Sequence, residues 1–170
     1  MNVLVSYDHR ADDLAALPVE ELIAFVLNEE GCPENSEVSV SFVDDDAIAA
    51  LNKEYRGKTG PTDVLSFECD GDDDGWMPLG DEAPFELGDV IIAPDVAQRQ
   101  TDLYGTSFEG EITLLLVHGL LHLCGYDHID DDEADEMEAR ERAVLGAWAD
   151  AGHEEMRHLR DDTIRVRGEH

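Results

Sequence analysis

The chain has 170 residues, of which 42% are hydrophobic and 31% charged, and its 42 acidic against 11 basic residues give a formal net charge of −31. This length and apolar content favour one folded domain and exclude a wholly disordered chain. No apolar run approaches the ~20 residues of a membrane-spanning helix, and no basic segment followed by an apolar stretch opens the chain as in a secretory signal, so we predict a cytoplasmic protein with no membrane partner.

Two patterns define the predicted elements of the first half of the chain. Alternating apolar and polar residues indicate strands, and apolar residues at helical spacing indicate helices. A proline indicates where a helix begins and a glycine where it ends, and a run of aspartates is also typical of the first turn of a helix. In chain order these patterns predict a strand over 2–7, a helix over 18–27, a strand over 37–43, a helix over 47–55 capped by the aspartates 44–46, and a strand over 62–67.

The second half begins with a continuous apolar run over 88–93, typical of a strand buried on both faces. A helix over 94–104 follows and ends at Gly105. Thr106 and Glu109 resemble a capping box for the next helix, which is apolar nearly all round and belongs in the middle of the domain. A last helix over 130–149 places its apolar residues on one face, namely Met137, Val144, Leu145 and Trp148.

This order of elements predicts an α+β fold, a mixed α/β layer in which helices pack on a central mixed sheet of about four strands. We place one domain over residues 1–150, with a metal site on its buried helix. Residues 151–170 are predicted to form a loosely attached polar tail with one helical turn around 154–159. The connection over 68–86 is rich in glycine and aspartate. Its aspartates at 70, 72, 74 and 81 leave a calcium loop open as an alternative to a solvated acidic loop, which is favoured.

Three of the seven histidines fall within eleven residues, in the string HGLLHLCGYDH. His118 and His122 are four residues apart on the predicted buried helix, so their rings share one face and can bind one ion. Gly125 can end the helix and turn the chain back, which lets His128 reach the same ion. Three imidazoles leave a fourth position for water, as in catalytic zinc sites. The alternative is that these histidines only satisfy local hydrogen bonds, but their spacing favours a metal.

The same spacing occurs in metzincin metalloproteases, with one difference. Those enzymes have a glutamate after the first histidine as general base, and here that position is Gly119. Asp127 could replace that base or could orient a histidine. Cys124, one of three widely spaced cysteines that argue against a disulfide framework, is expected to pack rather than ligate.

The histidine string closely resembles the bacterial YbeY family, as do the blocks LNKEYRGKTGPTDVLSF (51–67) and LGDVIIAPDVA (87–97). The resemblance implies a zinc-dependent, single-strand-specific endoribonuclease that acts in small-subunit ribosomal RNA maturation and ribosome assembly. It further implies one Zn²⁺ per chain on His118, His122 and His128, with Arg56 as the catalytic arginine. The implied partners are single-stranded ribosomal RNA and small-subunit ribosomal proteins or assembly factors. A guanidinium beside a zinc site suits this role, because it can hold a phosphodiester bidentately; a surface arginine paired with neighbouring acids is the alternative.

Two other functions stay open. A non-catalytic, zinc-stabilised assembly factor could use its acidic surface to meet basic ribosomal proteins. A peptide hydrolase is less favoured because of Gly119. The chain also departs from the family pattern at Glu68, where the family usually has proline, and in its net charge, since the family presents a basic cleft.

Overall fold

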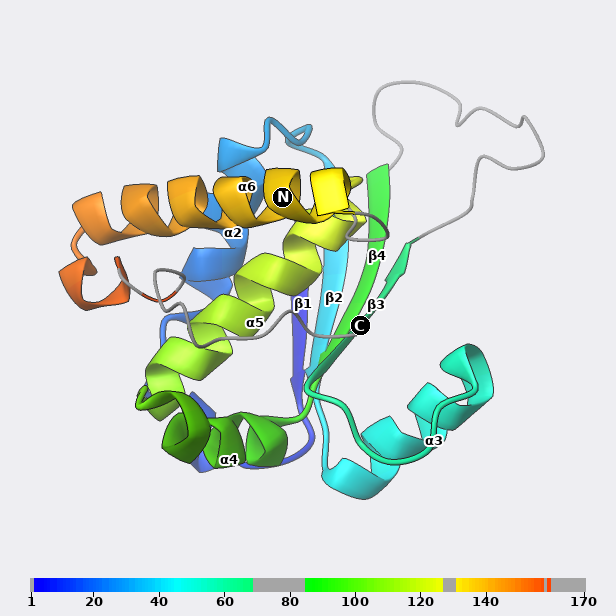
Figure 1. Ribbon diagram of the computed structural model, residues 1–170. Helices are drawn as coiled ribbons and strands as arrows, with labels where there is room; N and C mark the ends of the chain where they lie inside the picture. The colour runs from blue at the N-terminus through cyan, green and yellow to red at the C-terminus, as the bar shows by residue number, and fades with distance from the viewer. Residues whose placement is uncertain (1, 69–84, 127–130, 158, 160–170) are drawn as a thin grey trace, which may run out of the picture.

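A four-stranded sheet with helices on both faces forms the centre of the computed structural model (Figure 1). The structure describes residues 2–68, 85–126, 131–157 and 159. The elements run in the order β1 (Asn2–Tyr7), α1 (Ala11–Leu14), α2 (Val19–Glu29), β2 (Ser36–Phe42), α3 (Asp45–Arg56), β3 (Val64–Glu68), β4 (Phe85–Ile92), α4 (Pro94–Tyr104), α5 (Phe108–Leu123), α6 (Asp131–Asp150) and the short 3₁₀ helix η1 (Glu154–Met156).

The sheet has the strand order β1-β2-β4-β3. β1, β2 and β4 are parallel, and β3 pairs antiparallel with β4 at one edge. The connections between the parallel strands contain α1 and α2 in one case and α3 and β3 in the other, because parallel neighbours need a crossover. The mixed sheet of four strands and the α+β class predicted from the sequence are therefore confirmed.

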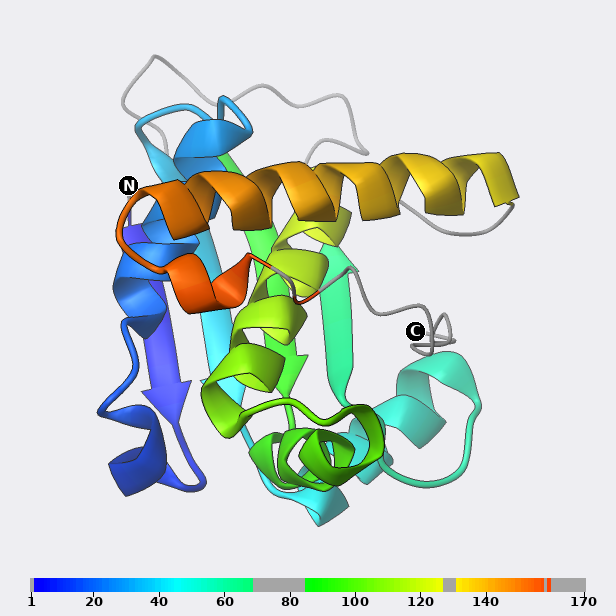
Figure 2. The ribbon, with the colours of Figure 1, turned by 60° about the vertical axis from the view of Figure 1, so that its left-hand side comes forward.

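The two faces of the sheet are covered differently. One face, with Val40, Phe42 and Val90, packs against α2 and α5 in the main core, and α6 crosses over α5 (Figure 2). The other face packs in part against α3, where Ile48 meets Leu65. α5 therefore lies between the sheet and α6, which is why it is apolar nearly all round, as its sequence predicts.

Two glycines allow the chain to pack closely around the edge strand β3. Gly88 of β4 has φ +137°, and a Cβ there would collide with the backbone oxygen of Phe67. Gly119 of α5 faces the sheet, since a Cβ at this position would lie 2.7 Å from Cγ1 of Val90 and 3.3 Å from Oγ of Ser66. Any larger residue at either position would push apart the elements that meet there.

The start of α5 differs by one residue from the predicted capping box. Ser107 is the N-cap, and its hydroxyl accepts a hydrogen bond from the backbone N–H of Gly110 at 2.9 Å. The hydroxyl of Thr106 instead donates to the buried carboxylate of Glu111 at 2.7 Å. The predicted reciprocal pair of Thr106 and Glu109 was therefore wrong, although the helix itself is confirmed.

The observed elements differ from the predicted ones in three further respects. The four-residue helix α1 was not predicted, and β4 begins at Phe85, three residues earlier than expected. The segment after α6 is not loosely attached from its start: Met156 and Leu159 are buried in the main core, and the ring of His153 stacks on Trp148 with centroids 3.8 Å apart. The packed part of the chain thus extends beyond the predicted boundary at residue 150. The aspartates of the possible calcium loop lie outside the described residues.

Candidate active site

Helix α5 brings His118 and His122 together, as their spacing predicts. Their ring centroids are 4.8 Å apart, and their Nε2 nitrogens are shielded from solvent. The backbone that carries these rings is well supported, because α5 is N-capped by Ser107 and is buried along nearly all of its length. After Leu123 the chain turns through Gly125, which has φ +105°, so the helix ends where the sequence predicts. The two rings are therefore positioned to share one ligand.

Another side chain, Glu141 of α6, approaches His118. Its Oε2 lies 3.5 Å from Nδ1 of His118, and its side chain is only 1% exposed. This residue was not predicted from the sequence, although a signal was present. Glu141 falls on the apolar face of α6, four residues after Met137 and seven before Trp148, where a glutamate is unusual.

Gly119, between the two histidines, faces away from any metal that they could hold. Its carbonyl oxygen accepts a hydrogen bond from Ser66 of β3 at 3.1 Å, and a side chain at this position would meet Val90 and Val64. The position that holds the general base in metzincins therefore points into the core in this chain. A peptidase mechanism that uses this position is excluded by packing as well as by residue type.

The donor set fits a zinc ion as far as the structure describes it. Imidazole nitrogens are ordinary zinc ligands, and two at helical spacing of four residues can bind one ion from the same side. His128 and Asp127 lie outside the described residues, and within these no group of three potential ligands comes together. The third ligand thus stays a prediction.

Cys124 packs against the main core, as expected. Its Sγ lies 3.8 Å from Sγ of Cys32, which follows α2, and both are free thiols. Burial raises the pKa of the Cys124 thiol to about 12, so this sulfur stays protonated at neutral pH. The wide separation of these cysteines in the sequence gave no indication that they are neighbours.

Arg56 lies in the last turn of α3, on the opposite face of the sheet from α5. The edge strand β3 lies between them: Tyr55 contacts Phe67 of β3 with ring centroids 5.2 Å apart, while Gly119 contacts Ser66 from the other face. α3, which carries Arg56, and α5, which carries the histidine pair, thus approach β3 from opposite faces of the sheet.

The cations at the end of α3 are available to an external anion. Four arginines of this acidic chain form ion pairs with carboxylates, namely Arg10, Arg99, Arg140 and Arg157. Lys53 and Arg56 form none within the described ranges, so the alternative of an Arg56 paired with neighbouring acids is not observed there. Tyr55 is 61% exposed beside them. Lys53 and Tyr55 are therefore further candidate site residues. The sequence signal for this segment was that both lysines of the chain, at 53 and 58, fall within it.

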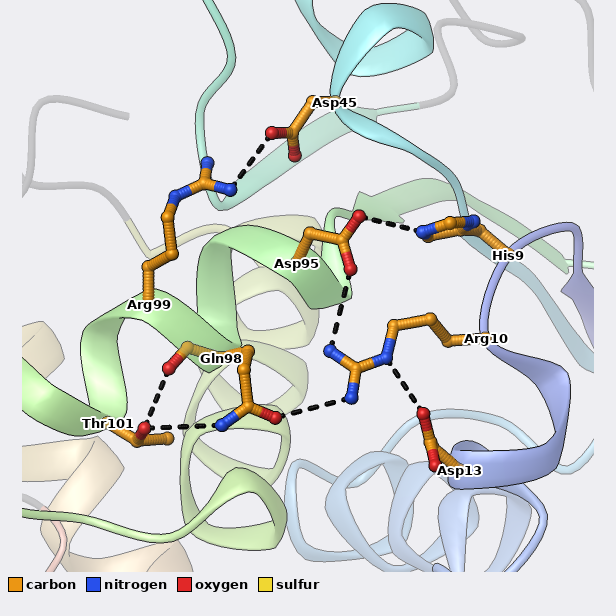
Figure 3. Close-up of polar contacts among 8 residues, drawn as sticks. All are labelled: His9, Arg10, Asp13, Asp45, Asp95, Gln98, Arg99 and Thr101. Atoms are coloured by element: carbon orange, nitrogen blue, oxygen red, sulfur yellow. Dashed lines mark hydrogen bonds and ion pairs between the residues drawn. The ribbon is translucent and has the colours of Figure 1, made fainter.

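A second polar cluster lies at the carboxyl ends of the parallel strands (Figure 3). His9 contacts Asp95 of α4 at 2.7 Å, so it is not a free surface residue. Arg10 has φ +58°, and its guanidinium lies over the ring of Phe108. The guanidinium of Arg10 donates hydrogen bonds to Asp13, Asp95 and Gln98. This cluster therefore connects the turn after β1 to α4, and the charge of Arg10 is already paired within the chain.

Comparisons with known proteins agree on one family. Residues 5–149 match the family model described as Endoribonuclease YbeY. The protein named Endoribonuclease YbeY in Bacillus subtilis (strain 168) is 44% identical over 131 residues, which are 76% of this chain and 83% of the relative. The Macrococcus caseolyticus protein of the same name is 44% identical over 143 residues, which are 83% of this chain and 91% of the relative.

A further relative and a solved structure extend these matches. The Endoribonuclease YbeY of Frankia alni is 41% identical over 150 residues, which are 87% of this chain and 83% of the relative. The solution structure of TM1509 from Thermotoga maritima has a similar fold, with a TM-score of 0.53 and 23% identity over 98% of this chain and 99% of that one.

Proposed function

This chain belongs to the YbeY family of endoribonucleases, and we propose that it is a zinc-dependent endoribonuclease that cleaves single-stranded ribosomal RNA during maturation of the small ribosomal subunit. The observation that supports this most directly is the pair of rings on α5. His118 and His122 lie side by side at the spacing of a shared metal ion. The family membership supports the endoribonuclease activity, and the donor set supports the metal.

In this proposal His118, His122 and His128 hold one Zn²⁺. When bound, zinc supplies a Lewis acid for the phosphodiester. Arg56 binds a phosphate through its guanidinium, which matches two phosphate oxygens at once. Lys53, one turn earlier on α3, adds a second positive charge for the backbone, and the exposed ring of Tyr55 offers a base a face to stack on.

The arrangement around β3 favours a single strand over a duplex. The cations of α3 and the histidines of α5 lie on opposite faces of the sheet, with one edge strand between them. A flexible single strand can bend over that edge, whereas a stiff duplex cannot follow so short a turn. The net charge of −31 disfavours RNA over most of the surface, so the cations of α3 are the phosphate contacts that we propose.

The cellular setting follows from the same proposal. We place the protein in the cytoplasm, where it meets immature ribosomal subunits. No helix among residues 2–68, 85–126, 131–157 and 159 has both the length and the apolarity to span a membrane. Small-subunit ribosomal proteins or assembly factors are the proposed protein partners, because an acidic surface complements basic ribosomal proteins. A non-catalytic assembly factor is the alternative function, and the acidic surface is the observation that favours it.

Metal analysis combined with cleavage of a labelled single-stranded RNA tests the proposal. We expect one zinc per chain, and loss of cleavage in both His118→Ala and Arg56→Ala at several salt concentrations. Arg142→Ala is the matched control, since it removes an exposed arginine from α6, away from β3, and should cleave as the wild type does. Circular dichroism confirms that each variant is folded. Bound zinc without cleavage that depends on these residues, at any salt concentration, would favour the assembly factor instead.

A further inference from the structure

Two glutamates of the described chain are fully buried, and their surroundings differ. Glu111, near the start of α5, accepts a hydrogen bond from the hydroxyl of Thr106 at 2.7 Å. Glu141 faces Nδ1 of His118 at 3.5 Å. Removing a carboxylate from water is costly unless a partner compensates for it. In a chain with 42 acidic residues, most of which can remain in solvent, a buried glutamate beside a histidine of the proposed site calls for a physical reason.

The geometry around His118 supplies one. An imidazole has two nitrogens, and when one of them binds a metal the other is free to donate its hydrogen. Nδ1 of His118 is the nitrogen that faces Glu141, which leaves Nε2, on the other side of the ring, for a metal. Metal-binding histidines commonly donate their second N–H to a carboxylate, which fixes the ring orientation and makes the nitrogen that binds the metal a better donor.

The position of Glu141 on α6 suits such a role. α6 crosses over α5, and its buried residues Met137, Val144 and Trp148 anchor this face of the helix in the core. The carboxylate therefore approaches His118 from a helix that is itself fixed, rather than from a mobile loop. A rigid support of this kind restricts the ring of His118 to the orientation that the second ligand, His122, requires.

We propose that Glu141 is a positioning residue, which accepts the Nδ1 hydrogen of His118 and thereby sets the tautomer and orientation in which Nε2 of this histidine binds zinc. This inference rests on the proposed zinc site, and it assigns a role to a residue outside the histidine motif. Glu141 is not a proposed ligand of the ion, and the role assigned to it is exerted through His118.

Zinc affinity tests this role without reference to RNA cleavage. The purified full chain is stripped of metal and titrated with zinc against a chromophoric chelator, in the wild type and in Glu141→Gln, Glu141→Asp and Glu111→Gln. We expect Glu141→Gln to bind zinc about 10–100-fold more weakly, as is typical when the partner of a metal-bound histidine is lost. Glu141→Asp keeps the charge but withdraws the carboxylate by one methylene, so its affinity should fall between those of the wild type and Glu141→Gln.

Glu111→Gln is the matched control, because it neutralises an equally buried glutamate at the opposite end of α5 from the histidines. Its zinc affinity should equal that of the wild type even if its thermal stability falls. The visible spectrum of bound Co²⁺, which reports ligand geometry, should change in Glu141→Gln and not in Glu111→Gln. Tight zinc binding retained in both Glu141 variants would overturn this inference alone. A wild type that binds zinc no better than His118→Ala would instead refute the proposed zinc site, and this inference with it.

Discussion

Exchange of a single glycine for alanine should have opposite effects at Gly146 of the partly exposed helix α6 and at Gly119 of the buried helix α5. In an exposed helix interior, Gly→Ala raises stability by about 1 kcal/mol, since alanine loses less backbone freedom on folding. At Gly146 of α6 the nearest atom to an added Cβ is 3.8 Å away, so the gain should be realised there. At Gly119 the added Cβ would lie 2.7 Å from Cγ1 of Val90, which is fully buried and, being β-branched, has little freedom to move.

The expected cost at Gly119 has two parts. Overpacking a buried position costs about 1–3 kcal/mol. Displacing α5 from the sheet also weakens the hydrogen bond from Ser66 to the Gly119 carbonyl, which contributes about 1 kcal/mol. Since the gain in helix propensity offsets about 1 kcal/mol, Gly119→Ala should lower the free energy of unfolding by about 1–3 kcal/mol.

Urea unfolding at fixed salt and zinc concentration, followed by circular dichroism, measures both variants. Gly146→Ala should shift the midpoint to higher urea and Gly119→Ala to lower urea, with the slope of the transition unchanged. A Gly119→Ala variant as stable as the wild type would show that α5 does not approach β4 as closely as the structure has it. The conclusion that the Gly119 position points into the core, away from a possible metal, would then be wrong as well.

Three further outcomes are expected. Ser107→Ala removes the N-cap of α5 and should lower the free energy of unfolding by about 1 kcal/mol; an unchanged urea midpoint would mean that another group caps the helix. Met156→Ala should cost about 2–5 kcal/mol, as is usual for a buried methionine, whereas a change near zero would show that η1 does not pack on the core. Because burial raises the pKa of Cys124 to about 12, its alkylation by iodoacetamide in the native chain should keep accelerating above pH 9, while in urea the rate levels off near the ordinary thiol pKa. Peptide mass analysis distinguishes Cys124 from Cys32, and a native rate that levels off near pH 9 would contradict this burial.

The regular elements could be predicted from the sequence where a pattern extends over several residues. The alternation in β2 and the apolar run of α5 are strong signals, because they reflect burial of one face and of the whole surface, respectively. The four residues of α1 are too few to show any period. Thr106 and Ser107 are both good capping residues, and the choice between them depends on Glu111, whose burial brings the Thr106 hydroxyl to it instead.

The candidate site divides in the same way. The histidine pair follows from a local spacing of four residues, so the sequence was sufficient to place it. Glu141 and the neighbouring thiols of Cys32 and Cys124 depend on how α2, α5 and α6 dock, and contacts between distant segments leave no local pattern. The packing of α3 and α5 on opposite faces of the sheet was also hidden, since it depends on contacts between distant segments.

The burial of α5 has a consequence for how this protein can evolve. The helix that bears His118 and His122 is also the central support of the core, so a substitution along it changes folding and the proposed metal site together. A deep mutational scan would therefore find α5 intolerant throughout, with no boundary between the two causes. The exposed end of α3 is different, because Lys53 and Tyr55 add little to the core. Natural variation could retune the proposed RNA contacts at this end of α3 while the fold and the proposed metal centre stay unchanged.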